Sequence, residues 1–119
     1  MITGFESETG ALTFYEEFKL VPVAIAGLRV KSGKDKAVKN AYICSALQRQ
    51  GYDINEARLR KIINYIRTNN LVVGLIATSS GYYVARSLKE MEDYADSLRG
   101  RENAIRQVRE SIESQMKYY

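Results

Sequence analysis

Histidine is absent from this chain of 119 residues, and cysteine occurs only once. These absences exclude a zinc site built from cysteine and histidine, a serine or cysteine nucleophile with a histidine base, and an intramolecular disulfide. The single cysteine, Cys44, lies in the apolar stretch "AYICSALQ". We expect it to be a small buried residue rather than a reactive thiol.

Long apolar runs and a leader peptide are also lacking. No apolar run reaches the roughly 20 residues that a membrane span needs. The start, "MITGFESETGAL", has neither the basic nor the apolar region of a signal peptide. We therefore expect a cytoplasmic protein with no membrane partner.

Features of an enzyme are missing as well. Gly27 and Gly33 are one residue too far apart for a phosphate-binding GxxxxGK loop, and no serine or threonine follows Lys34. Neighbouring carboxylates such as Glu16 and Glu17 diverge by about 100° on a helix, so they cannot share a substrate. The sequence predicts no catalytic site, no metal site and no cofactor.

The charge that is present has a mild basic bias. Lysine and arginine number 18 against 14 aspartates and glutamates, a formal charge of +4. The length suits one domain with a modest core. Whether the bias indicates an acidic partner such as nucleic acid depends on where the basic side chains gather.

The chain up to Gly51 predicts two helices. Thr13 and Glu16 have the spacing of a capping box, so a helix is expected to begin near Phe14, and Pro22 should kink it or mark a second start. The charged stretch "KSGKDKAVKN" reads as a loop. A second helix should follow it, behind a possible Asn40 cap, and end at Gly51.

The third helix is expected from Glu56 to Asn69 with Asn55 as its cap. Its apolar residues Leu59, Ile62, Ile63 and Ile66 recur at spacings of three and four, which predicts one buried stripe. The basic and amide side chains fall on the opposite side and its flanks, namely Arg58, Arg60, Lys61, Asn64 and Arg67.

Two later segments complete the expected fold. The stretch "LVVGLIATSSGYYVAR" predicts a β-hairpin with strands near Val72 to Ala77 and Tyr82 to Ala85, and Gly81 supplies the turn or bulge dihedral. A long helix should then run from Leu88 to Tyr119 behind a Ser87 cap. Its seam has heptad spacing: Met91, Tyr94, Leu98, Ile105, Val108 and Ile112. Such a helix either packs within its own chain or, as we expect, pairs with a second copy.

The order of helix, short helix, turn, basic helix and hairpin resembles the winged helix-turn-helix superfamily. The resemblance lies in "ICSALQRQGYDINEARLRKIINYIRTNNLVVGLIATSSGYYVA", and the appended helix makes the chain similar to small winged-helix proteins of bacteriophages and prophages. It implies a mostly α fold with a small β-hairpin wing: a flexible N-terminus over residues 1–12, the winged domain over 13–86, and a C-terminal helix, a possible dimerisation coiled coil, over 87–119.

The resemblance also implies a function. The third helix of that superfamily usually enters the major groove of double-stranded DNA while the wing touches the backbone. Carried onto this chain, the DNA contacts are Arg58, Arg60, Lys61, Asn64, Arg67, Lys36, Lys39, Thr78, Ser79 and Ser80. The expected protein is a homodimeric, phage-type regulator of replication or transcription on nucleoid or phage DNA.

Two other interpretations stay open at this stage. The basic residues of the third helix also suit a merely solvated surface. Moreover, the hairpin tip "ATSSG" carries no lysine or arginine. The fold therefore also suits a protein interaction module that engages a phage or host component of replication, transcription or host defence without reading DNA.

Overall fold

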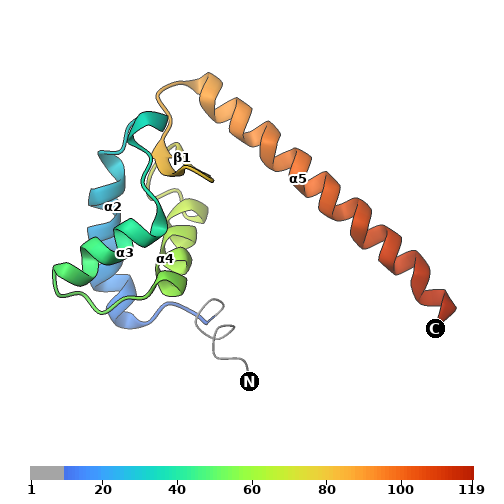
Figure 1. The fold of residues 1–119 in the computed structure, drawn as a ribbon, viewed down its shortest axis with the longest axis horizontal. Helices are drawn as coiled ribbons and strands as arrows, with labels where there is room; N and C mark the ends of the chain where they lie inside the picture. Colours follow the sequence, from blue (N-terminus) through green and yellow to red (C-terminus); the bar gives the residue numbers. More distant parts are fainter. Residues whose placement is uncertain (1–9) are drawn as a thin grey trace. The chain divides into compact units, whose positions relative to one another are not determined.

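The computed structural model describes residues 10–119, so most of the N-terminal segment predicted to be flexible lies outside the described residues. The described chain is mostly helical, with one small two-stranded antiparallel sheet and a long C-terminal helix (Figure 1). It divides into two units, Met1–Arg86 and Ser87–Tyr119.

The first helical segment begins at the predicted capping box. The backbone N–H of Thr13 donates to Glu16 Oε1 at 2.8 Å, and the N–H of Glu16 donates back to Thr13 Oγ1 at 3.1 Å. A π-helical stretch, η1 (Glu16–Leu20), leads directly into α2 (Val21–Arg29). Pro22 lies in the first turn of α2, where its missing N–H is tolerated, so the proline marks a second start.

The second helix, α3 (Asn40–Arg49), ends where the sequence predicts. The N–H of Tyr52 donates to the carbonyl of Leu47, the N–H of Gly51 donates to that of Gln48, and Gly51 has a φ of +93°. This is the Schellman motif, which favours glycine in the left-handed conformation. The expected Asn40 cap is wrong. Asn40 is the first helical residue, and its Nδ2 donates to the carbonyl oxygen of Glu56 at 2.9 Å.

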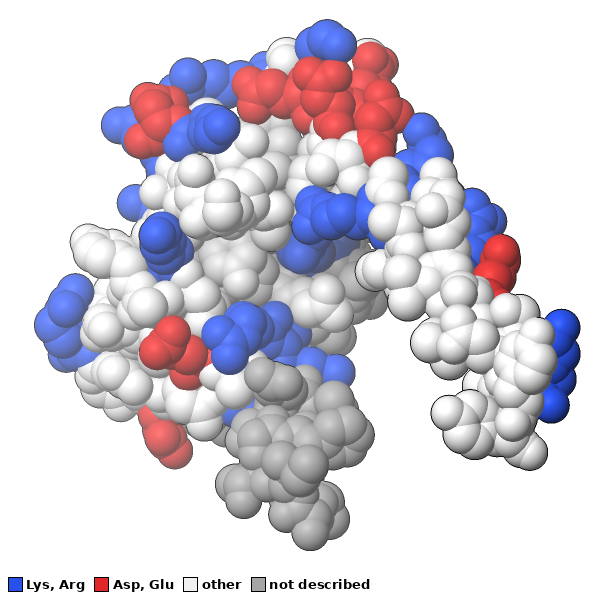
Figure 2. Space-filling view, turned by 45° about the vertical axis from the view of Figure 1, so that its right-hand side comes forward, with Lys and Arg blue, Asp and Glu red and all other residues white. Residues whose placement is uncertain are grey.

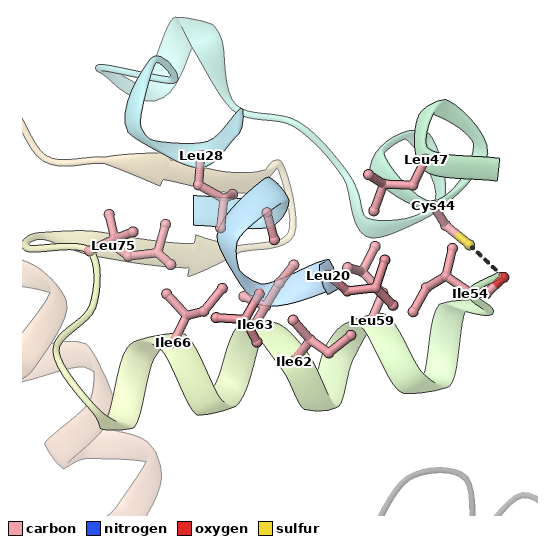
Figure 3. Close-up of a cluster of buried hydrophobic side chains, with 13 residues drawn as sticks. Leu20, Leu28, Cys44, Leu47, Ile54, Leu59, Ile62, Ile63, Ile66 and Leu75 are labelled. Atoms are coloured by element: carbon pink, nitrogen blue, oxygen red, sulfur yellow. Dashed lines mark hydrogen bonds between the residues drawn. The ribbon is translucent and has the colours of Figure 1, made fainter. Parts of the chain in front are cut away.

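The third predicted helix is α4 (Glu56–Thr68), and Asn55 caps it as predicted by accepting a hydrogen bond from the N–H of Arg58 at 2.8 Å. The helix ends at two asparagines, the second of which, Asn70, has a φ of +57°. The four predicted core residues of α4 are all buried. Figure 3 shows these side chains, Leu59, Ile62, Ile63 and Ile66, projecting from α4 toward Leu20 of η1 and Leu28 of α2.

The predicted hairpin is present but shorter at its first strand. β1 (Leu75–Thr78) pairs antiparallel with β2 (Gly81–Val84), and Ser79 and Ser80 form the turn. Residues 71–74 are bends and turns, with Gly74 at a φ of +78°, so the first strand starts three residues later than expected.

A third length of backbone lies against the hairpin. The N–H of Val38 donates to the carbonyl of Tyr82 at 3.0 Å, the reciprocal bond is 2.8 Å, and Ser32 forms a second bridge with Val84. From the sequence we expected only a charged loop over this stretch. The polar side chains of this stretch do not alternate with apolar ones. The sequence therefore contains no period-two pattern that would predict the pairing with β2.

Cys44 is buried, as expected. Its side chain is 3% exposed, and Sγ lies 3.9 Å from the carbonyl oxygen of Ile54, the contact drawn in Figure 3. Burial raises the pKa of the Cys44 thiol, and the negative charge of Glu56 adds to that rise. The group is therefore a packed thiol rather than a thiolate nucleophile.

The second unit is one helix, α5 (Leu88–Gln115), followed by the short 3-10 turn η3 (Met116–Tyr118). Ser87 caps α5 by accepting a hydrogen bond from the N–H of Glu90 at 3.2 Å. Gly100 does not interrupt the helix, and no residue of α5 is buried.

Candidate nucleic-acid interface

The outer face of α4 carries most of the expected DNA contacts. Arg60 and Asn64 are exposed, and Lys61 and Arg67 are partly exposed. All four side chains lie on the side of the helix away from the buried stripe or on its edges. Glu56, in the first turn, is the one acidic residue of this helix. The helix therefore presents a face that is positively charged and rich in hydrogen-bond donors.

Arg58 departs from the expected role. Its Nη2 lies 2.5 Å from Glu16 Oε1 and its Nε lies 2.8 Å from Glu16 Oε2, while its remaining donors reach the carbonyls of Gly10 and Ala11 at 3.0 and 2.9 Å. The side chains of Arg58 and Glu16 are only 14% and 7% exposed. Arg58 thus ties α4 to the start of the first helix, and this geometry replaces the base or phosphate contact we expected.

The Arg58–Glu16 pair also changes the acidity of the carboxyl group. Hydrogen bonds from the guanidinium hold the pKa of Glu16 below its ordinary value, although burial acts in the opposite direction. Glu16 also closes the capping box with Thr13. The Glu16 carboxylate therefore caps the start of the first helix and also binds Arg58 of α4.

The lysines of the 31–39 stretch lie beside the hairpin and next to the start of α3. Lys36 and Lys39 are exposed, and together with Lys31 and Tyr42 they line an open hollow on the surface. Val38 is bonded to β2, while Asn40 is bonded to the first turn of α4. Lys39 is therefore held between the hairpin and the beginning of the basic helix.

The hairpin turn places Thr78, Ser79 and Ser80 at its tip, all of them exposed. Thr78 Oγ1 accepts a hydrogen bond from the N–H of Ser80 at 3.1 Å, so that hydroxyl already has a partner within the turn. The pairing of Val38 with Tyr82 lies one residue from the turn. The tip and Lys39 consequently lie on the same part of the unit.

The predicted seam of α5 is exposed along its length. Ile105, Val108 and Ile112 are 70%, 64% and 52% exposed, and Met91 and Leu98 are about 40% exposed. Figure 2 shows an uncharged strip along the C-terminal half of this helix, with Lys and Arg side chains along its edge. Tyr94 is the seam residue that is partly buried.

An exposed aromatic pair lies on the first helical segment, where the sequence had not suggested a contact site. Phe14 and Phe18, one helical turn apart, stack with ring centroids 4.2 Å apart, and they are 77% and 59% exposed. Their spacing of four is the signal that could have found them. Exposed aromatic surface of this kind is a feature of protein contact sites.

Comparison of the chain with known protein families, with curated proteins and with solved structures found no match. Among residues 10–119, no helix combines the length and apolar character needed to cross a membrane.

Proposed function

We propose that residues 13–86 are a winged helix-turn-helix unit that binds double-stranded DNA, with α4 in the major groove and the β1–β2 hairpin as the wing. The order of α2, α3, α4 and hairpin supports this, as does the 31–39 backbone that pairs with β2. In this proposal the protein acts as a regulator of replication or transcription of the phage type.

The outer face of α4 is the observation that carries the proposal. Arginine and asparagine present paired donors and acceptors that match the edges of guanine and adenine, so Arg60, Asn64 and Arg67 are the proposed base-reading residues. Lys61 is assigned to phosphate contact because an ammonium group attracts charge without a fixed geometry.

Phosphate contacts next to the groove are assigned to the surface around the start of α3. Lys36 and Lys39 supply positive charge there. Ser79 and Ser80 offer hydroxyl donors at the hairpin tip, and Thr78 contributes through the shape of the turn. With Arg58 committed to Glu16, the proposed DNA-contacting set is smaller than the sequence suggested.

The first test is a double charge reversal, Arg60→Glu with Lys61→Glu. We expect loss of duplex binding with an unchanged melting temperature, since neither side chain belongs to the buried stripe. Binding is measured by fluorescence anisotropy with a pool of random duplexes. The slope of log affinity against log salt should be negative for the unaltered protein, because each neutralised phosphate releases counterions.

A matched control reverses the same number of charges elsewhere on the unit. Lys19→Glu with Arg49→Glu alters two exposed basic residues on η1 and α3. This control should retain binding apart from a small loss through net charge. Equal losses in the two double variants would remove α4 from the mechanism.

We also propose that the protein is a homodimer through α5. A helix of 28 residues with no buried residue and an apolar seam gains most of its stability from a partner. Sedimentation at several protein concentrations tests this proposal, and a monomer at all concentrations would contradict it.

The second candidate is a protein interaction module, which the exposed Phe14 and Phe18 stack favours. In that case the double variant Phe14→Ser with Phe18→Ser abolishes capture of a protein partner and leaves duplex affinity unchanged. Tight, salt-sensitive duplex binding by the unaltered protein, with no protein captured, would exclude this candidate.

A further inference from the structure

The seam of α5 can be assigned to heptad positions from its spacing. Five residues occupy the first core position, Met91, Leu98, Ile105, Ile112 and Tyr119, and four occupy the second, Tyr94, Arg101, Val108 and Gln115. The positions that flank the core on one side are Ala95, Glu102, Arg109 and Met116, and those on the other side are Glu90, Ser97, Ala104, Ser111 and Tyr118. This assignment decides between the two ways that two copies of α5 can pair.

A parallel pair is poorly supported by these residues. It would place Arg101 opposite Arg101 of the second copy, so two like charges would meet in the core. Across its flanks, Ser97 would meet Glu102 and Ala104 would meet Arg109. Neither flank would contain a pair of opposite charges to offset the repulsion.

We infer that two copies of α5 pair antiparallel, with Ile105 of one copy packed against Val108 of the other. This inference rests on the proposed self-association of α5. In this arrangement Arg101 lies opposite Ile112 rather than another arginine, and its long stem can cover that side chain while the guanidinium reaches water. Leu98 then lies opposite Gln115.

The flanking charges agree with the antiparallel arrangement. Glu102 of each copy faces Arg109 of the other, which gives two opposite-charge pairs around the central layer. Arg109 also has an ion pair with Glu113 of its own helix at 2.5 Å, so it lies between two carboxylates. On the other flank, Ala104 faces Ser111, and two small residues allow the helices to approach closely.

The same charges fix the register. A shift by one heptad in one direction would place Glu102 against Glu102, and a shift in the other direction would place Arg109 against Arg109.

The inferred pairing separates the points where the two first units are attached. With a rise of 1.5 Å per residue, the two Ser87 residues lie about 60 Å apart along the helix axis. In a parallel pair they would be neighbours. The orientation therefore determines how far apart the two proposed DNA-binding units begin.

Cysteine crosslinking of the full-length protein tests the orientation. The double variant Leu98→Cys with Gln115→Cys should form interchain disulfides under mild oxidation, because these two positions face each other across the inferred seam. Each single variant should form no interchain disulfide, since in an antiparallel pair each of these positions lies about 25 Å from the same position of the second copy. Cys44 stays in place, because it is buried and the unaltered protein measures its background.

The outcomes separate the alternatives. Efficient crosslinking of Leu98→Cys alone would establish a parallel pair and overturn the inference. A double variant that crosslinks no better than Glu110→Cys, a position on the outward face of α5, would also overturn it. Duplex binding is measured separately with the Arg60 and Lys61 variants, so failure of the inferred pairing is distinguishable from failure of the proposed DNA binding.

Discussion

At the scale of single residues, the side chain of Arg58 shows how a basic residue on a candidate DNA-binding helix can be engaged in contacts within its own protein. Its guanidinium donates hydrogen bonds to a buried carboxylate and to two backbone carbonyls. The pair is largely desolvated, and the loss of one partner leaves the other charge buried without compensation. Arg58 therefore contributes to this protein by joining the first helix to α4.

We expect Arg58→Met to lower the free energy of unfolding by about 2 to 3 kcal/mol at neutral pH, somewhat less than the loss of a fully buried pair. The difference should shrink on acidification. Because Arg58 depresses the pKa of Glu16, the stabilisation is present above the ordinary glutamate pKa and is lost as the pH falls through the lowered value.

Urea denaturation over a series of pH values measures this effect, and Arg49→Met, which alters an exposed arginine of α3, is the control. A stability difference between Arg58→Met and the unaltered protein that stays constant down to strongly acidic pH would contradict the proposed linkage to Glu16.

At the scale of elements, the hairpin is held against the rest of its unit by a backbone approach that only glycine permits. Gly81 has a φ of +118°, and a Cβ atom there would collide with the carbonyl group of Val38 and lie 2.9 Å from the nitrogen of Lys39. The 31–39 stretch could not then pair with β2 in the observed way. Gly81 therefore positions Lys39 beside the hairpin tip as well as forming the turn.

The substitution Gly81→Ala should destabilise the protein by more than about 1 kcal/mol, since both the dihedral and the close contact are incompatible with a side chain. In contrast, Gly27→Ala in α2 meets nothing within 4 Å, and it should stabilise the protein by about 0.5 to 1 kcal/mol through helix propensity. Thermal unfolding of the two variants measures both effects. Equal shifts in melting temperature for the two would contradict this account of the hairpin.

At the scale of the whole molecule, the described chain combines a unit with its own core and a helix, α5, that has no fully buried residue. We propose that the first unit binds DNA and that α5 mediates self-association. If the tails pair antiparallel, the pair of flanking charges Glu102 and Arg109 governs both the orientation and the strength of the dimer.

Charge reversal at that flank gives a further expectation. Glu102→Arg should weaken self-association roughly tenfold, because two attractive pairs become repulsive in each dimer. Adding Arg109→Glu should restore part of it. The restoration is partial because the ion pair of Arg109 with Glu113 is lost at the same time.

Analytical ultracentrifugation over a concentration series measures the dissociation constants, and Glu110→Arg makes the same charge change on the outward face. In a parallel pair Glu102 would face Ser97, so its reversal would weaken the dimer no more than the control does. That result would count against the antiparallel arrangement.

Local signals in the sequence predicted much of the first unit. The caps at Thr13, Asn55 and Ser87, the stop at Gly51 and the buried stripe of α4 all arise from interactions within a few residues, so the residues themselves carry the information. The position of the hairpin was predicted for the same reason, although bends before Gly74 shortened its first strand.

The caps at Thr13, Asn55 and Ser87, the helical periods and the heptad spacing of α5 follow from the order of the residues alone, because each depends on neighbours in the chain. Only the tertiary structure shows that Arg58 of α4 is engaged by a buried carboxylate. The contact of Arg58 with Glu16 spans 42 residues, and no local pattern distinguishes Arg58 from Arg60. The pairing of Val38 with Tyr82 likewise becomes visible only in the fold, since backbone hydrogen bonds between distant segments require no particular side chains.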